Sequence, residues 1–133
     1  MSTMSYAALT GIASSIITEL KKGRPRTLEL SSAHNVVTLA GVEPGQHLFM
    51  TAVDMEDLAP GDAGILVEVI AISIAMKRQI EFTNPMFFEE RERVTARVQV
   101  RFSGTSVVKQ VQERGMGRAT IVELAKSGCY HAV

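Results

Sequence analysis

The chain has 133 residues, of which 46% are hydrophobic and 21% are charged, a composition typical of a folded globular domain and not of a disordered segment. Its 14 Lys and Arg balance its 14 Asp and Glu, which excludes long-range attraction of a polyanion by net charge. At this length one hydrophobic core is expected, and we predict a single domain over residues 1–133.

The N-terminal segment predicts a strand followed by a helix. Residues 6–9 are typical of a short strand. Ile12, Ile16 and Leu20 then recur every four residues, which places one apolar stripe on a helix. Gly23 is a typical C-terminal cap, so the helix is expected to end there.

A second strand and a second helix are expected next. Polar and apolar residues alternate over residues 27–30, as in a half-buried strand. Residues 36–39 fit a short helix that stops at Gly41, although the same residues also fit a strand.

Two Pro-Gly pairs, at 44–45 and 60–61, predict type II turns, because Pro fixes a negative φ and Gly tolerates the positive φ that follows. Each turn is expected to deliver a strand, over residues 48–53 and 65–74.

The C-terminal half predicts two further strands and one more helix. Asn84-Pro85 is typical of a turn, and the strict alternation over residues 94–102 predicts a strand. The valines of residues 107–111 suggest a short helix that ends near Gly115, and a last strand is expected over residues 119–124. This pattern predicts an α+β fold, a small mixed β-barrel or strongly bent sheet with two or three short helices.

Four cations lie within six residues just after the first helix: Lys21, Lys22, Arg24 and Arg26. Lys and Arg here could hold phosphates, with Thr27, Ser31 and Asn35 adding neutral hydrogen bonds. The alternative is a solvated helix end, partly neutralised by Glu19 and Glu29. Arg97 and Arg101, on the polar face of the 94–102 strand, form a secondary basic surface that lacks aromatic residues for base stacking.

The histidines and the single cysteine predict neither a metal site nor a catalytic centre. His34, His47 and His131 lack metal-ligand spacing, and no Ser-His-Asp or Cys-His arrangement is evident. Cys129 cannot form an internal disulfide, which favours a reducing compartment. The longest apolar stretch, residues 64–76, is interrupted by Glu68, so neither export nor membrane spanning is expected and a cytoplasmic location is predicted.

Two shorter segments are candidate surface features. Phe87-Phe88 could form a loop that packs on the core or on a second subunit, which leaves a homodimer open as an alternative. Residues 114–118, RGMGR, match neither a P-loop nor a dinucleotide fingerprint and are expected to form a turn.

The stretch GRPRTLELS resembles the motif of the ASCH domains, a branch of the PUA-like barrel superfamily. Gly23, Arg26 and Glu29 fall near the glycine, lysine and glutamate positions of that motif, with one extra residue after the glycine, and Ser31 replaces its arginine. The resemblance implies a PUA-like mixed β-barrel and an RNA-associated role, with the ligand held beside the first helix.

Some small ASCH proteins are amidohydrolases that act on acetylated cytidine and use the motif lysine. Here that position holds Arg26, which stays protonated at ordinary pH and cannot act as a base. The resemblance therefore favours anion or nucleotide recognition, unless Lys21 or Lys22 reaches the site.

Over most of the chain, the segments RTLELSSAHNVVTL, PGQHLFMT, EDLAPGDAGI and RVTARVQVRFSGT are similar to an uncharacterised archaeal family, a domain of unknown function best known from methanogens. This similarity implies a cytoplasmic archaeal setting and no established activity.

Together these observations predict a non-catalytic RNA- or nucleotide-binding module without cofactor or metal. Arg24 and Arg26 would contact phosphate, while Glu29 and Asn35 would read polar edges of a base. The residues expected to line the cleft are Arg24, Arg26, Thr27, Glu29, Ser31, His34 and Asn35. The alternatives are a hydrolase acting on a modified nucleoside, with Glu29 or His34 as general base, and a structural subunit acting through protein partners.

Overall fold

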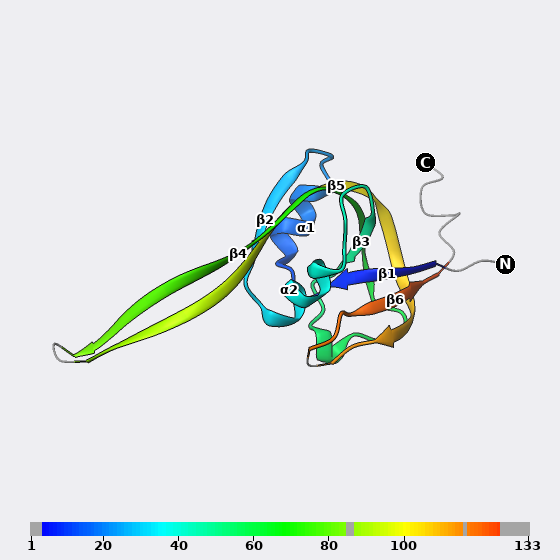
Figure 1. Ribbon diagram of the computed structural model, residues 1–133. Coiled ribbons are helices and arrows are strands. Elements are labelled where there is room, and N and C mark those ends of the chain that lie inside the picture. The colour runs from blue at the N-terminus through cyan, green and yellow to red at the C-terminus, as the bar shows by residue number, and fades with distance from the viewer. Residues whose placement is uncertain (1–3, 85–86, 116, 126–133) are drawn as a thin grey trace.

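The computed structural model describes residues 4–84, 87–115 and 117–125, with the backbone alone for residues 76–93. Within these residues it contains two α-helices, one 3-10 helix and six strands (Figure 1). In chain order these are β1 (Met4–Leu9), α1 (Ser14–Leu20), β2 (Arg26–Leu30), α2 (Ala33–Ala40), β3 (His47–Met50), η1 (Met55–Asp57), β4 (Ala63–Asn84), β5 (Phe87–Glu113) and β6 (Ile121–Leu124). The predicted α+β class with short helices is confirmed.

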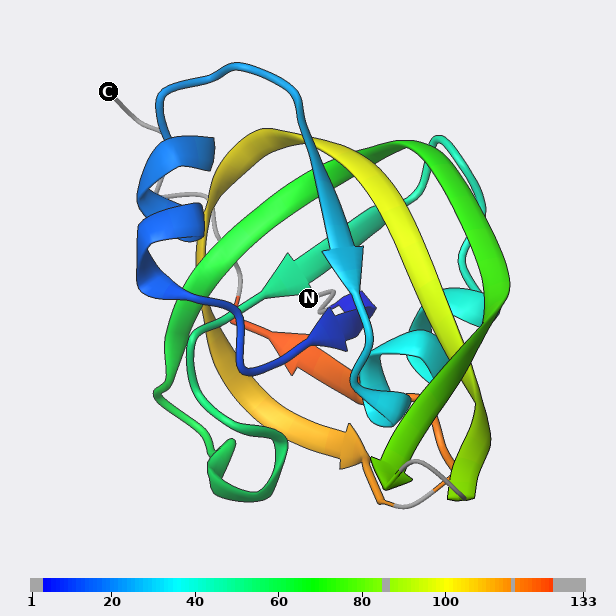
Figure 2. The same cartoon turned by 90° about the vertical axis from the view of Figure 1, so that its left-hand side faces the viewer.

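The strands form one mixed sheet in the order β2-β5-β4-β3-β1-β6, and the sheet bends until β6 also pairs with β5 (Figure 2). β1 runs parallel to β3, and the other pairs are antiparallel. Among the described strands, β5, β4, β3, β1 and β6 therefore form a hydrogen-bonded ring, and β2 is attached to the outside of this ring through β5. The main core cluster includes buried side chains of β1, β3, β4 and β5, on which α1 and α2 pack with Leu20 and Leu39.

Both Pro-Gly pairs form the predicted turns. Gly45 has φ 94° and Gly61 has φ 97°, the positive values that a type II turn requires at that position. In each turn the residue after the glycine donates its N–H to the carbonyl three residues earlier, at 3.1 Å. The turns lead directly into β3 and β4, as expected.

The first helix and the second helix agree with the sequence in type and in where they end. Gly23, with φ 94°, follows α1 and donates its N–H to the carbonyl of Leu20 at 3.0 Å. Ile12 is buried but precedes the helix, which begins at Ser14. Residues 33–40 form helix and not strand, which settles that alternative.

β4 and β5 are much longer than the predicted strands and project from the sheet as a two-stranded arm (Figure 1). Their pairing runs from Ala63↔Val107 out to Asn84↔Phe87. Among the described strands, residues 75–84 and 87–95 pair only with each other, because β3 reaches β4 at residues 65–68 and β2 reaches β5 at residues 96–100. The prediction of a loop at Phe87-Phe88 is wrong, because this backbone is part of β5. Pro85, from the predicted Asn84-Pro85 turn, lies outside the described residues.

The prediction of a helix over residues 107–111 is also wrong, because β5 continues as a strand to Glu113. Val108 pairs with Leu124 and Val111 pairs with Val122, and a register shift lies between Val108 and Gln110. The extra residue at this bulge places both valines against the same core cluster although they are three residues apart. A bulged strand thus shows the spacing that usually indicates a helix.

Within the described residues, no helix reaches the length and apolar character that crossing a bilayer would require.

Candidate binding site around the first helix

A shallow hollow, which we name the β2 hollow, lies where β2 passes beside α1 and the loop before it. Its volume is about 290 Å³. Four of the seven predicted site residues line it: Arg26, Thr27, Glu29 and Asn35. The other three are placed around it: Arg24 is exposed on the loop before β2, Ser31 is exposed just after β2, and His34 is half-buried on α2.

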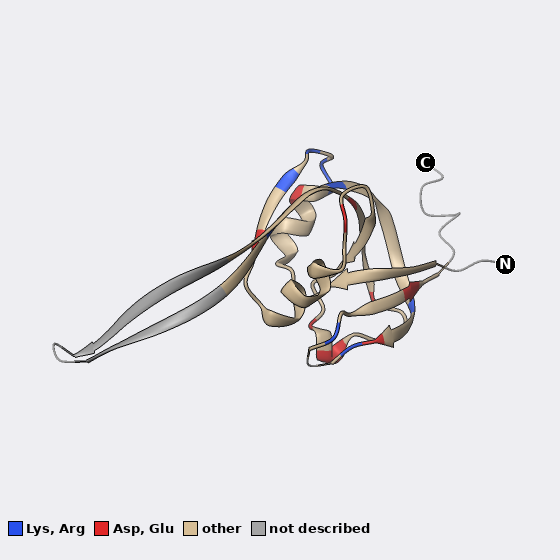
Figure 3. Ribbon diagram, viewed as in Figure 1, with Lys and Arg blue, Asp and Glu red and all other residues tan. Residues whose placement is uncertain are grey.

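The basic cluster forms an exposed edge where α1 ends and β2 begins, which is visible as the blue segments at the top of Figure 3. Glu19 is the acid nearest to it: Lys22 Nζ lies 3.0 Å and Arg26 Nη1 lies 3.7 Å from its carboxylate oxygens. The hydrogen bond from Lys22 lowers the pKa of Glu19, with a smaller contribution from the charge of Arg26. Within the part of the chain that the structure describes, Lys21 and Arg24 make no ion pair. The edge therefore keeps a net positive charge.

The strand pairing brings the secondary basic surface next to this edge, a relation that the sequence did not reveal. β2 lies beside β5 with Glu29 opposite Arg97, and their charged groups are 3.3 Å apart. Arg101 Nη2 lies 2.7 Å from Glu68 on β4, and this hydrogen bond lowers the pKa of Glu68. Each arginine thus has a carboxylate partner, so this surface is less basic than its sequence suggests.

Asn35 is buried, with 1% of its surface exposed, and its amide is used inside the protein. Thr10 N–H donates to Asn35 Oδ1 at 3.0 Å, and Asn35 Nδ2 donates to the carbonyl of Thr10 at 2.9 Å. These two bonds fasten α2 to the end of β1. In this arrangement the amide presents no polar edge to a base.

His34 and Glu29 do not meet at one catalytic position. Glu29 lines the β2 hollow, whereas His34 does not, and His34 Nε2 is buried without a hydrogen-bond partner among the described residues. Those residues also hold no group of three His, Cys, Asp or Glu side chains that could bind a metal ion. Cys129 and His131 lie outside the described residues.

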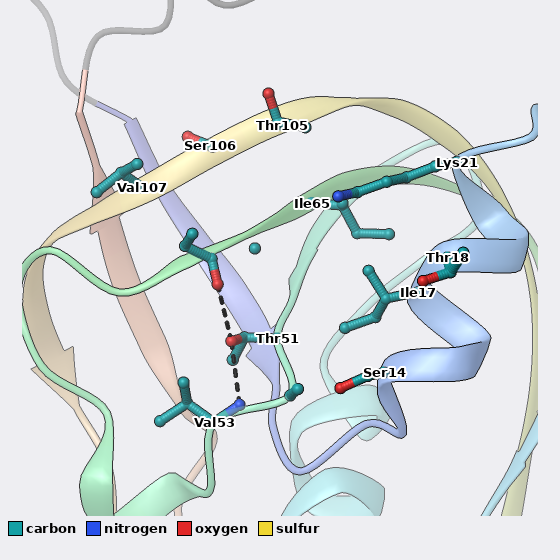
Figure 4. A pocket seen from close by; sticks show the side chains of 13 residues that line it. Ser14, Ile17, Thr18, Lys21, Thr51, Val53, Ile65, Thr105, Ser106 and Val107 are labelled. Carbon is teal, nitrogen blue, oxygen red and sulfur yellow. Dashed lines mark hydrogen bonds between the residues drawn. The ribbon is translucent and has the colours of Figure 1, made fainter.

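A larger hollow, which we name the α1–β4 pocket, opens on a different face of α1 and was not predicted from the sequence (Figure 4). Its volume is about 440 Å³. One wall is α1, with Ser14, Ile17, Thr18 and Lys21 at the spacing of one helical face, and the facing wall is built from β4 and β5. The polar residues at 14, 18 and 21 were a usable signal, but the residues opposite them, 63–65 on β4 and 105–107 on β5, are distant in the chain.

Comparison with known proteins places the chain in a family. Residues 4–122 match the family model described as a protein of unknown function, DUF473, and the chain therefore belongs to this family. It is also 31% identical over 101 residues to an uncharacterized protein of Methanocaldococcus jannaschii, a match that covers 76% of this chain and 62% of that protein. The expected similarity to an uncharacterised archaeal family is confirmed.

Proposed function

We propose that this DUF473 member is a non-catalytic RNA- or nucleotide-binding module that contacts phosphate through Arg24 and Arg26. The observation that carries this proposal is the exposed basic edge: four cations within residues 21–26, with Glu19 as the acid paired to two of them. Arginine guanidinium groups match the geometry of phosphate oxygens, and such contacts supply most of the affinity of sequence-independent nucleic-acid binding.

The position of the ASCH-like motif supports a PUA-like assignment as part of the same proposal. Gly23 follows the end of α1, and Arg26 and Glu29 lie on β2, where both line the β2 hollow beside the first helix. That is the place where the resemblance puts a ligand. The ring of five strands is compatible with a small mixed barrel.

Contacts within the protein occupy two of the side chains that were predicted to recognise a base. Glu29 is held by Arg97 and Asn35 by Thr10, so neither is available to read a base in this arrangement. Thr27 and Ser31 are exposed and can add neutral hydrogen bonds. With no Trp in the chain and few other aromatic residues, binding should be dominated by phosphate and show little sequence preference.

The proposal is tested by reversing the two arginine charges. Arg24→Glu/Arg26→Glu should weaken binding of a labelled single-stranded RNA by at least tenfold at low salt, because both side chains would then repel phosphate. The slope of log affinity against log salt should also become shallower by about 0.7 for each phosphate that the variant no longer neutralises. Fluorescence anisotropy across a salt series measures both quantities, and competition by a mononucleotide distinguishes a nucleotide site from an RNA-backbone site.

A matched control is Lys109→Glu/Arg118→Glu, which changes the net charge by the same amount at exposed positions on β5 and on the loop before β6. This control should bind RNA almost as well as the wild type does. Equal loss in both double variants would show a non-specific charge effect, and undetectable binding of RNA and nucleotides by the wild type at low salt would reject the proposal.

The projecting arm favours a second candidate, a subunit that associates with a copy of itself. An isolated two-stranded ribbon is marginally stable in water, and both of its edges offer unpaired backbone groups to another chain. Ile74 and Val94 at its base are 45% and 39% exposed. Residues 76–93 contain four Lys or Arg and four Glu, so two copies could approach without net repulsion.

Shortening the arm should therefore change the oligomeric state. Replacing residues 77–93 by a two-residue Asn-Gly turn keeps the Met76↔Val94 register, so it should leave the folded ring intact and convert a dimer into a monomer in light scattering. A wild type that stays monomeric at every concentration, or a shortened chain that still dimerises, would contradict this candidate.

A further inference from the structure

We propose that the α1–β4 pocket binds a small organic carboxylate, a molecule with one negative charge and a short apolar body. This inference does not rest on the proposed RNA binding: the pocket lies on a different face of α1 from the β2 hollow, and among the described residues it shares Lys21 alone with the basic edge. Its volume of about 440 Å³ is within the range of small-molecule sites.

The charge of the pocket comes from one residue. Among the described residues that line it, Lys21 is the only charged one. Figure 4 shows the Lys21 side chain extending from the end of α1 toward the strand wall. Neighbouring Lys22 is paired with Glu19, whereas Lys21 has no ion-pair partner in the described part of the chain. One ammonium group without an acid matches a single negative charge.

A buried hydroxyl in the wall lacks the partner that burial normally requires. Ser106 is 3% exposed, and its Oγ makes no hydrogen bond to any described residue. An unpartnered buried hydroxyl costs folding free energy, and because this oxygen is closed to solvent, its side chain must turn toward the pocket before a ligand oxygen can accept from it. Thr51 differs, because its hydroxyl donates to the carbonyl of Ala63 at 3.0 Å and accepts from the N–H of Val53 at 3.2 Å. The Ser106 hydroxyl is therefore free to gain a ligand contact by a rotamer change, whereas the Thr51 hydroxyl is already used in the fold.

The remaining walls are apolar and specify the body of the ligand. Ile17 reaches in from α1 and Ile65 lies opposite it on β4 (Figure 4), and Val107 on β5 also lines the pocket. Burying hydrocarbon of a ligand against these walls is favourable, and inorganic phosphate has no hydrocarbon to bury. A phosphate dianion would also need more cationic or N–H donors than one lysine supplies. A carboxylate attached to a short hydrocarbon or a ring satisfies the lysine, the hydroxyl and the walls together.

The test uses benzoate as the probe and the full chain labelled with ¹⁵N. Benzoate should shift the amide resonances of Gly64, Ser106 and Val107 saturably, with a dissociation constant in the millimolar range or below. Benzamide, which has the same shape without the charge, should bind at least tenfold more weakly, and phosphate should not displace benzoate at equal concentration.

Variants then locate the contact. Lys21→Met should weaken benzoate by about tenfold, whereas the matched variant Lys22→Met should not. Ser106→Ala should weaken benzoate severalfold while leaving the melting temperature unchanged or higher, since it removes an unpartnered hydroxyl. Arg24→Glu/Arg26→Glu should keep benzoate binding, which separates this site from the RNA surface.

Any of four results would overturn the proposal. Equal binding of benzoate and benzamide would show that the charge is not recognised, and equal loss in Lys21→Met and Lys22→Met would show that the ammonium of Lys21 is not the contact. Saturable shifts located away from β4, β5 and α1, or no saturable shifts at all, would show that the pocket does not take this class of ligand.

Discussion

Gly64→Ala is expected to destabilise the protein by about 3 kcal/mol, an unusually large effect for one added methyl group. A Cβ at residue 64 would lie 2.5 Å from Cζ of Phe49 and would also overlap the carbonyl oxygen of Met50. Both neighbours are fully buried on β3, which is hydrogen-bonded to β4 through Met50↔Ile65. Neither can move away without disturbing that strand pair. Denaturant unfolding of the full chain, followed by circular dichroism, measures the loss.

The neighbouring strand provides a matched control. Gly104 lies on β5 opposite Leu66, and a Cβ built there meets nothing within 4 Å. Gly104→Ala should therefore be neutral or stabilise by up to about 1 kcal/mol, because alanine restricts the unfolded chain more than glycine does. If both variants lost the same free energy of unfolding, the close contact at Gly64 would not be the cause.

Features with a local cause could be predicted from the sequence. The two Pro-Gly turns need only the φ preferences of two adjacent residues, and both have the expected geometry. The end of α1 depends on Gly23 in the same way. The basic edge was also visible, because its four cations are neighbours in the chain.

Features that depend on distant partners could not be predicted. The bulge near Gln110 lets Val108 and Val111 face one core cluster, and no local rule distinguishes that from a helical stripe. The arm continues through a charged segment whose strand pairing is not indicated by alternation. The need for a glycine at residue 64 comes from Phe49 and Met50, which only the β3–β4 pairing brings close.

The candidate site likewise combines features that depend on neighbouring residues with features that depend on distant ones. Arg24 and Arg26 are exposed as expected. Asn35, which was grouped with them because it is close in the sequence, is instead buried. The α1–β4 pocket combines α1 with residues 51–53, 63–65 and 105–107, so its outline exists only once the sheet has closed. Polar residues that are neighbours in the chain therefore identified the basic edge, but they could not identify the α1–β4 pocket.

Asn35→Ala should cost about 2–4 kcal/mol of stability, because it leaves the N–H and the C=O of Thr10 without partners inside the protein. Asn35→Asp should lose at least as much, because its carboxylate would be desolvated in this buried position and would face the Thr10 carbonyl without a donor to offer it. Ser31→Ala, at an exposed position of the same predicted cleft, should change stability by no more than about 0.5 kcal/mol.

These three variants, measured by denaturant unfolding together with RNA binding, distinguish a structural role of Asn35 from a role in ligand recognition. If the Asn35 amide has a structural role, Asn35→Ala should lose much stability, and the RNA affinity of the remaining folded protein should be close to that of the wild type. A ligand-reading amide predicts the reverse, a stable variant that binds RNA poorly. The second result would mean that the bonds to Thr10 open when ligand binds, and base recognition would return to the β2 hollow. The first would leave phosphate contact at Arg24 and Arg26 as the basis of binding, and would explain why this amide lies so close to the basic edge: it holds α2 against β1, next to the strand that carries Arg26.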